Sequence, residues 1–204
     1  METAKKTRMR RGRKRPVAGR VQILAAARTI GVRKGWTAVT IRSVAHDLGY
    51  TSPLLYEHFR DKEDLLTQIA VDAIALFEKS LTKKLPDNAN DTPLQTMVRR
   101  YWTFMLRHKQ LYRLANAMDG VPIDKKAIDW SAQSLCKAMG DRVRPLLEEN
   151  ATEADVKTLV DELWALLHGM AALYMDRSAP FNLTKVTAAA MKLISGAPRS
   201  RLVL

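Results

Sequence analysis

The sequence has little of what marks several large classes of protein. Its single cysteine, Cys136, excludes a disulfide within the chain. No apolar run approaches the roughly 18 residues that span a bilayer, and no apolar stretch follows the basic N-terminus as it would in a secretory signal. We therefore expect a protein of the reducing cytoplasm that does not enter a membrane.

Signatures of catalysis and of metal binding are also absent. The chain contains no Gly-x-Ser-x-Gly, no His-Glu-x-x-His and no Gly-rich phosphate-binding loop. Its four histidines stand apart from thiols and from carboxylate pairs at metal-ligand spacing. We expect no catalytic residue, no metal site and no cofactor, and hence a protein that is not an enzyme.

No segment alternates in the manner of a strand, whereas helical periodicity recurs along the chain. We therefore expect an all-α fold. Pro145 should bend or end one of its longer helices. The apolar pattern and its Thr, Ser, Asp and Gly boundaries predict about nine helices, at 18–34, from the N-cap Thr40 to Gly49, in a very short stretch from Ser52, and at about 61–85, 92–108, 110–118, 124–149, 152–177 and 183–195.

The excess of positive charge is concentrated in the first third of the chain, and the length allows a small domain and a larger one. Residues 1–70 hold 15 Lys and Arg against 6 Asp and Glu, whereas residues 71–204 hold 19 against 15. Eight of these cations fall within Lys5–Arg15, so we expect a disordered basic arm at 1–16 that is attracted to a polyanion, or alternatively a solvating tail. Residues 17–66 would form a small first domain and residues 67–204 a larger helical one.

The segment GYTSPLLYEHFRDKEDLL, residues 49–66, joins short helices through a turn. Gly49 supplies the positive φ that ends one helix, and Ser52 followed by Pro53 is typical of an N-cap and a first helical position. Leu55 and Phe59 stand four residues apart and can share an inner face. Two short helices joined by a Gly-containing turn are a helix-turn-helix signature, so the second should enter the major groove of DNA.

From about Val21 to Leu66 the chain resembles the TetR family of bacterial one-component transcription regulators, most specifically in LYEHFRDKEDLL. The resemblance implies an all-helical homodimer with a three-helix DNA-binding domain and a larger ligand-binding and dimerisation domain. We accordingly expect a bacterial, cytoplasmic, nucleoid-associated protein. The DNA-binding residues that follow are Thr40, Arg42, Thr51, Ser52, Pro53, Leu54, Tyr56, His58 and the phosphate-binding Lys62.

Two positions of this surface have alternative roles. Tyr56 either contacts DNA or packs partly against the first helix with only its hydroxyl exposed. Glu57 either accepts a hydrogen bond from a cytosine amine or, as we favour, points to solvent.

Large adaptable side chains are concentrated between residues 92 and 177. Most should form a core, but Met and aromatic residues in a helical bundle also suit a pocket for a lipophilic or aromatic molecule. For His168, a structural role with satisfied hydrogen bonds is at least as well favoured as ligand contact. The expected effector-binding residues are Tyr101, Trp102, Met105, Tyr112, Asn116, Trp164 and His168.

The segment ELWALLHGMAALYM, residues 162–175, resembles the penultimate helix of a TetR subgroup with a Trp-x-x-x-His-Gly signature. Small residues at helical spacing along it would let another helix approach closely, as at a dimer seam. Alternatively, the strip packs inside its own subunit. The expected seam residues, in this helix and the last one, are Ala165, Leu166, Gly169, Ala172, Leu173, Ala190 and Ile194.

Together these patterns favour a dimeric repressor that binds a palindromic operator in double-stranded DNA and is released by an unidentified small molecule. The alternative is an effector-independent or low-specificity DNA-binding protein of the nucleoid type. A third class, an enzyme or carrier that retains the scaffold, is disfavoured by the missing catalytic signatures.

Overall fold

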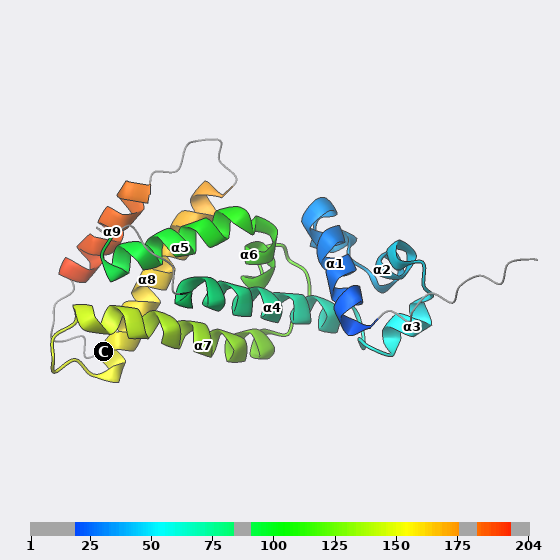
Figure 1. Cartoon of the computed structure of the whole chain (residues 1–204), viewed down its shortest axis with the longest axis horizontal. Helices are drawn as coiled ribbons and strands as arrows, with labels where there is room; N and C mark the ends of the chain where they lie inside the picture. Colours follow the sequence, from blue (N-terminus) through cyan, green and yellow to red (C-terminus); the bar gives the residue numbers. More distant parts are fainter. Residues whose placement is uncertain (1–18, 84–90, 176–182, 197–204) are drawn as a thin grey trace, which may run out of the picture.

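The computed structural model describes residues 19–83, 91–175 and 183–196, so the expected basic arm at 1–16 lies outside the described residues. Within those ranges the chain forms α-helices and two 3-10 turns and contains no strand, which confirms the all-α fold. Helices α1–α3 lie at one end of an elongated molecule, and α4 leads from them into a bundle formed with α5–α9 (Figure 1). The bounds are α1 (Arg20–Lys34), α2 (Ile41–Leu48), α3 (Ser52–Tyr56), α4 (Lys62–Thr82), α5 (Pro93–Arg107), α6 (Lys109–Ala115), α7 (Lys125–Val143), α8 (Glu153–Tyr174) and α9 (Leu183–Gly196), with 3-10 turns at Trp36–Ala38 and Arg144–Leu146.

Local capping sets several of the helix boundaries that the sequence predicted. Thr40 Oγ1 accepts a hydrogen bond from the Ser43 N–H at 3.0 Å, and Ser43 Oγ accepts one from the Thr40 N–H at 2.9 Å. Gly49 ends α2 in the left-handed region at φ 69°. Asp61 caps α4 by accepting a hydrogen bond from the Asp64 N–H.

Several boundaries differ from those expected, among them the following. Ser52 is not the N-cap of α3 but its first residue; the N-cap is Thr51, whose side chain makes no capping hydrogen bond. The helix expected at 124–149 ends at Val143, because Pro145 cannot continue it and lies in the 3-10 turn that follows. The helix expected to reach 85 ends at Thr82.

The apolar core has two parts that meet around α4 and α6. The first joins α1–α3 to the start of α4 and includes Trp36, Leu55 and Phe59. It continues into the bundle, where further members are Leu111, Leu114 and Val121. The second fills the space between α4, α5, α7, α8 and α9. Three partly buried residues, Leu76, Ala115 and Ile128, pack against both parts, so the two parts form one continuous apolar interior.

The described helices include neither a membrane span nor a metal cluster. The longest, α8, has 22 residues, and none in the described ranges is long and apolar enough to cross a bilayer. Over the same ranges no group of three or more His, Cys, Asp or Glu side chains could hold a metal ion.

Candidate functional site

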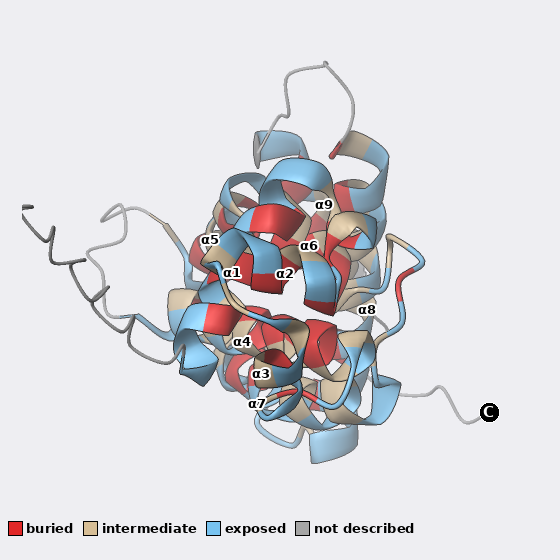
Figure 2. Ribbon diagram, turned by 90° about the vertical axis from the view of Figure 1, so that its right-hand side faces the viewer, coloured by how far each residue is buried: buried red, intermediate tan, exposed pale blue. Residues whose placement is uncertain are grey.

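The outer face of α2 and α3 presents side chains to solvent at the end of the molecule that faces the viewer in Figure 2. Tyr56 is 55% exposed, so it does not pack into the core against α1. Leu55 and Phe59 are buried beneath it and fix the orientation of α3. Of the other residues predicted to bind DNA, Thr40, Arg42, Thr51 and Pro53 are exposed, and Ser52, Leu54, His58 and Lys62 are partly exposed.

His58 is partly exposed, but one of its ring nitrogens is hidden from solvent. Its Nε2 atom is buried and has no hydrogen-bond partner among the described residues. A contact with DNA through Nε2 would require the ring to rotate, and the contact of His58 with DNA stays a prediction. Glu57, by contrast, is exposed, as expected for a residue that points to solvent.

Two cations hold this surface in place. The Arg20 guanidinium donates to the His58 carbonyl oxygen at 2.7 Å and to Gln68 Oε1 at 3.0 Å, and it lies 4.3 Å from the centre of the Phe59 ring. Lys62 Nζ donates to the Thr37 carbonyl oxygen at 3.1 Å. An ammonium carries three donors, so Lys62 keeps others that can reach a phosphate.

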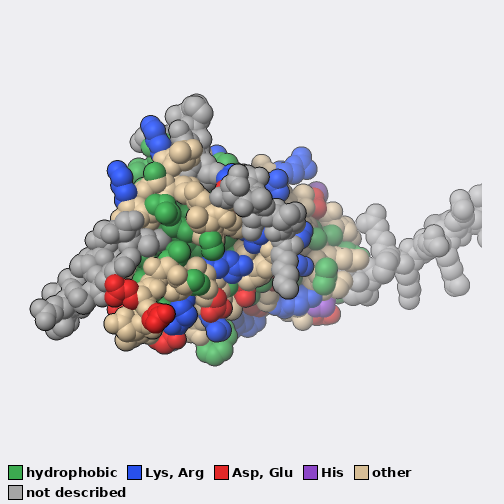
Figure 3. Space-filling view, turned by 60° about the vertical axis from the view of Figure 1, so that its left-hand side comes forward, with side chains coloured by type: hydrophobic (Ala, Val, Ile, Leu, Met, Phe, Trp, Pro, Cys, Tyr) green, Lys and Arg blue, Asp and Glu red, His purple; other side chains and the backbone are tan. Residues whose placement is uncertain are grey.

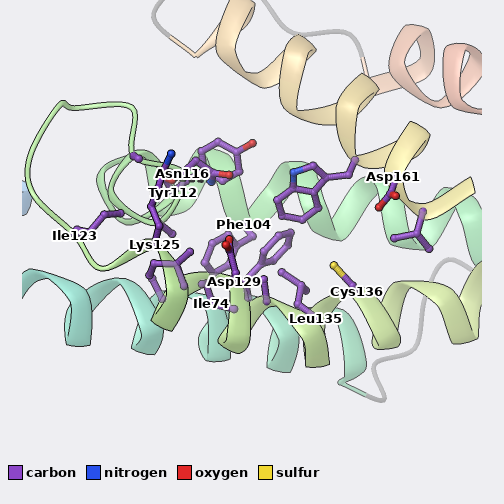
Figure 4. A pocket seen from close by; sticks show the side chains of 18 residues that line it. Ile74, Phe104, Tyr112, Asn116, Ile123, Lys125, Asp129, Leu135, Cys136 and Asp161 are labelled. Carbon is purple, nitrogen blue, oxygen red and sulfur yellow. Dashed lines mark hydrogen bonds between the residues drawn. The ribbon is translucent and has the colours of Figure 1, made fainter. Parts of the chain in front are cut away.

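A cavity of about 330 Å³, which we call the bundle pocket, opens between α4, α5, α6, α7 and α8 (Figure 4). In Figure 4, Tyr112 of α6 and Asn116, which follows α6, lie toward one end of the cavity, and Cys136 of α7 and Asp161 of α8 lie toward the other. Apolar side chains make up most of its wall, namely Ile74, Phe77, Phe104, Ile123, Ile128, Leu135, Val160 and Trp164. The polar side chains of the wall are Tyr112, Asn116, Lys125, Asp129, Cys136 and Asp161.

The residues predicted to bind an effector fall into three groups relative to this pocket. Tyr112, Asn116 and Trp164 line it. Tyr101 and His168 do not line it, but each hydrogen-bonds with the Tyr112 hydroxyl. Trp102 and Met105 are buried in the core outside the pocket. Periodicity placed all of them inside the bundle, but only the packing decides which of them meet an empty space.

A buried chain of hydrogen bonds runs behind the pocket wall. The hydroxyls of Tyr101 and Tyr112 are 2.6 Å apart, and the Tyr112 hydroxyl is 2.7 Å from His168 Nδ1. Tyr101 has no other side-chain partner among the described residues. Both hydroxyl protons therefore find an acceptor only if Tyr101 donates to Tyr112 and Tyr112 donates to His168. His168 then accepts at Nδ1 and carries its proton on Nε2.

The pKa values fit this arrangement. Burial raises the pKa of Tyr112 to about 12, and burial together with the neighbouring Tyr112 raises the pKa of Tyr101 well above its ordinary value. Burial also lowers the pKa of His168. All three groups are therefore neutral near pH 7, and the Tyr112 hydroxyl offers a ligand no free proton. Asn116 is the better polar anchor, since its Nδ2 uses one donor on the Tyr112 carbonyl oxygen at 2.9 Å and retains the other.

A surface groove between α7 and α8 continues from the bundle pocket. This groove, of about 920 Å³, shares with the pocket the residues Asp129, Ala132, Cys136, Val160 and Asp161. Burial and the nearby Asp161 raise the pKa of the Cys136 thiol, so it is protonated near pH 7. Because the groove and the bundle pocket share these residues, we expect the groove to be the route by which a molecule enters the pocket.

Helix α6 connects the bundle pocket with the helix-turn-helix. Tyr112 and Asn116 line the pocket, and two residues before Tyr112 the Gln110 carbonyl oxygen accepts a hydrogen bond from Trp36 Nε1 at 2.8 Å. Trp36 is 1% exposed and packs directly on Gly31 of α1. A displacement of α6 would therefore change the packing of Trp36 and, through it, the positions of α1 and of the 3-10 turn before α2.

The outer face of α8 carries small and apolar residues that leave room for another helix. Ala165, Gly169 and Ala172 are exposed, Leu173 is 58% exposed and Leu166 is partly buried. A Cβ atom built on Gly169 would meet no atom within 4 Å. Figure 3 looks from the bundle end and shows hydrophobic side chains gathered near the middle of the visible face.

Ala190 is a correction to the expected dimer seam. It is fully buried in the core of its own subunit, because the face of α9 that carries it packs against the bundle. The neighbouring Met191 is 40% exposed and offers the outward face of α9 instead. The side chain of Ile194 lies outside the described residues.

Several pocket and contact residues escaped the sequence prediction. Lys125 and Asp129 begin α7 and resemble an ordinary solvated helix face in the sequence. Phe104 lies between the predicted Trp102 and Met105 on the same helix, and no local signal separates it from them. Trp36 follows the glycine that ends α1, and its partner Gln110 is 74 residues away.

Two family models match the chain. One, described as bacterial regulatory proteins of the tetR family, matches residues 23–69, which contain α2, α3 and most of α1. The other, described as a tetracyclin repressor-like C-terminal domain, matches residues 94–195, which is half of the chain.

Individual relatives agree with this. The HTH-type transcriptional activator FasR of Mycolicibacterium smegmatis is 30% identical over 123 residues, which cover 53% of this chain and 55% of FasR. The chain thus spans about half the length of this relative. The uncharacterised HTH-type regulator Rv0681 of Mycobacterium tuberculosis is 25% identical over 157 residues, covering 76% of this chain and 70% of that protein.

Solved structures share the fold. The structure of the fatty acid degradation regulator FadR from Bacillus halodurans superimposes with a TM-score of 0.65 over 93% of this chain and 100% of that one, at 16% identity. At this identity the similarity shows the fold alone. The family models match both the exposed helix-turn-helix and the helical bundle with its pocket. The chain therefore belongs to the TetR family of bacterial transcriptional regulators.

Proposed function

We propose that the protein is a homodimeric repressor that binds a palindromic operator and leaves it when a small lipophilic or aromatic molecule occupies the bundle pocket. The observation that carries the proposal is the path through α6, which joins the pocket wall at Tyr112 and Asn116 to the helix-turn-helix at Trp36. The protein would act in the bacterial cytoplasm, on the nucleoid.

The proposed release is a shift between two conformations. Two recognition helices of a dimer must meet successive major grooves about 34–36 Å apart. A ligand that binds better to one position of α6 favours the matching tilt of α1, and this changes the spacing of the two α3 helices. The ligand should be mostly apolar and neutral, with one polar group near Asn116, because most of the pocket wall is apolar.

Two alternatives remain testable beside this one. The relative FasR is described as an activator. Whether this chain represses or activates transcription is decided by mapping the operator relative to the promoter and by measuring expression of a reporter gene. A low-specificity nucleoid protein would bind unrelated DNA almost as tightly as its preferred site. We expect instead a preference of at least about 1,000-fold, as specific DNA-binding proteins show.

The DNA-binding part of the proposal is tested by Tyr56→Ala. Once selection from a random DNA library has given the operator, this variant should bind it about 10-fold or more weakly, because a hydrogen bond to a charged phosphate contributes roughly 1.5–3 kcal/mol. Since the side chain is 55% exposed, the unfolding temperature should stay almost the same. Glu57→Ala, in the same turn, is the control and should keep or increase affinity. Full operator affinity in Tyr56→Ala would mean that α3 does not lie in the groove.

The pocket part is tested by filling the cavity with Ala132→Phe. Ala132 lines both the bundle pocket and the groove that leads to it, so a phenyl ring there should block entry. We expect the variant to bind the operator normally but to lose binding of prodan, a neutral fluorescent naphthalene, by at least about 10-fold. Ala75→Phe, on an exposed position of α4 outside the described pockets, is the matched control. Equal prodan binding in both variants would place the ligand elsewhere.

A further inference from the structure

A second hollow lies outside the bundle pocket, where α1 meets the corner between α5 and α6. We call it the junction pocket. It has a volume of about 330 Å³, and its wall includes Arg28, Val32, Leu76, Leu106, Arg107 and His108. The residues come from four helices and their corner, so the space is formed only when the helix-turn-helix end and the bundle are packed together.

One side of the junction pocket is strongly cationic. Arg28 comes from α1, Arg107 from the end of α5, and Lys109 from the start of α6. Asp72 on α4 is the nearest compensating charge, and its Oδ2 is 3.8 Å from Arg28 Nη2, a distance that makes a weak ion pair. No carboxylate of the described residues lies within 4 Å of Arg107.

Two side chains of the junction pocket, Arg28 and His108, have donor atoms that no acceptor uses within the described residues. Arg28 Nε is buried and has no hydrogen-bond partner among the described residues, a situation that is unfavourable unless an acceptor is supplied. His108 makes no side-chain hydrogen bond within the same residues, although its ring packs on Phe104 with centroids 4.9 Å apart. Burial, Arg107 and Arg28 together lower the pKa of His108, as expected where the fields of two guanidinium groups converge.

The other side of the junction pocket is apolar. Val32 is 49% exposed and Leu106 is 51% exposed, and both line the hollow together with Leu76 and Leu111. Exposed aliphatic side chains beside a group of cations match a ligand that has an acidic head and a short apolar body.

We propose that the junction pocket binds a small amphipathic carboxylate, with the carboxylate between Arg28, Arg107 and His108 and the chain against Val32 and Leu106. A guanidinium pairs with a carboxylate through two parallel N–H donors, and the ligand would supply the acceptor that Arg28 Nε lacks. This site goes beyond the proposed function, because it is separate from the bundle pocket and favours an anion, whereas the bundle pocket favours a neutral molecule.

The site also lies beside a contact that the proposed response uses. Gln110 lines the junction pocket and accepts the hydrogen bond of Trp36. Phe104 of α5 lines the bundle pocket, and His108, four residues later at the corner between α5 and α6, lines the junction pocket. A carboxylate bound there therefore changes operator affinity, and by linkage the operator changes the affinity for the carboxylate by the same factor.

The test is a titration of the full-length protein with sodium octanoate, observed through the ring resonances of the histidines in NMR spectra. We expect saturable shifts of the His108 resonances and a higher pKa of the His108 ring in the complex. The bound anion stabilises the protonated imidazolium, whereas the positive charges of Arg28, Arg107 and Lys109 oppose its protonation. Asp72 offsets little of this positive charge at His108, because it is already paired with Arg28. Binding should therefore tighten as the pH falls through the range in which His108 titrates.

Variants decide where octanoate binds. Arg107→Gln should weaken octanoate binding about 10-fold or more, whereas Arg33→Gln, an exposed position on α1 that does not line the pocket, should change it less than about 2-fold. Ala132→Phe, with the bundle pocket filled, should bind octanoate as the unaltered protein does. If Ala132→Phe abolished binding and Arg107→Gln left it unchanged, octanoate would occupy the bundle pocket and the proposal would fail. Inorganic phosphate should bind more weakly than octanoate; equal affinity would refute the amphipathic specificity.

Discussion

Gly31→Ala is expected to destabilise the protein by about 2 kcal/mol, although alanine normally favours a helix interior. A Cβ atom at residue 31 would lie 2.1 Å and 2.2 Å from two ring carbons of Trp36. The indole cannot easily move away, because it is 1% exposed and its Nε1 donates to the Gln110 carbonyl oxygen. The unfolding temperature should fall by roughly 4–8 °C for a chain of this size, measured by calorimetry.

The same substitution should also loosen the connection between the helix-turn-helix and the bundle. The indole N–H resonance of Trp36 should shift toward the position of a weaker hydrogen bond, and hydrogen exchange at that N–H should accelerate. Gly19→Ala is the control, because a Cβ there meets no atom within 4 Å and Gly19 only precedes α1; its cost should stay below about 1 kcal/mol. An unchanged unfolding temperature in Gly31→Ala would show that the Trp36 ring has another place to pack.

Gly169→Arg should convert the proposed dimer to monomers and reduce operator affinity by about 100-fold or more, because a monomer engages one half-site and loses the gain from the second. The exposed glycine has no neighbour within 4 Å of its Cβ position, so the arginine should not disturb the fold of the subunit. Sedimentation velocity at several protein concentrations gives the oligomeric state, and titration of full and half operators gives the affinities.

Ala75→Arg is the matched control for this variant, since it places the same side chain on an exposed position of α4. It should remain dimeric. A Gly169→Arg protein that sediments as a dimer would move the seam away from the outer face of α8, and the exposed side chains of Leu173 and Met191 would then need another partner.

Helix boundaries were predictable because they depend on neighbours in sequence. Thr92 and Gln95 cap α5 reciprocally, as Thr152 and Asp155 cap α8, and such pairs are visible in four consecutive letters. The outward position of the residues that we expect to bind DNA was predictable for a similar reason, because in a helix of only five residues few positions can face outward once Leu55 is buried.

The pocket was only partly predictable, because it depends on contacts between distant segments. Asn116 at the end of α6 and Asp161 of α8 line one cavity, although many residues separate them in the sequence. Trp102 and Phe104 are close on α5 and similar in character, yet only Phe104 lines the cavity. Ala190 shows the same limit, since a small residue on an amphipathic helix suits either the subunit core or a dimer seam.

The continuous apolar interior limits how such a regulator can be recombined with its relatives. Leu111, Leu114 and Val121 belong to the core that holds α1 and α3 in place, although they are encoded well after α4 ends. A hybrid gene with a single junction after α3 or within α4 would combine one parent's DNA-reading helices with the other parent's supporting side chains. A hybrid that keeps operator specificity must also exchange the stretch around α6 as a second insert. The residues that fold together as the DNA-binding unit are therefore encoded by two separate segments of the gene.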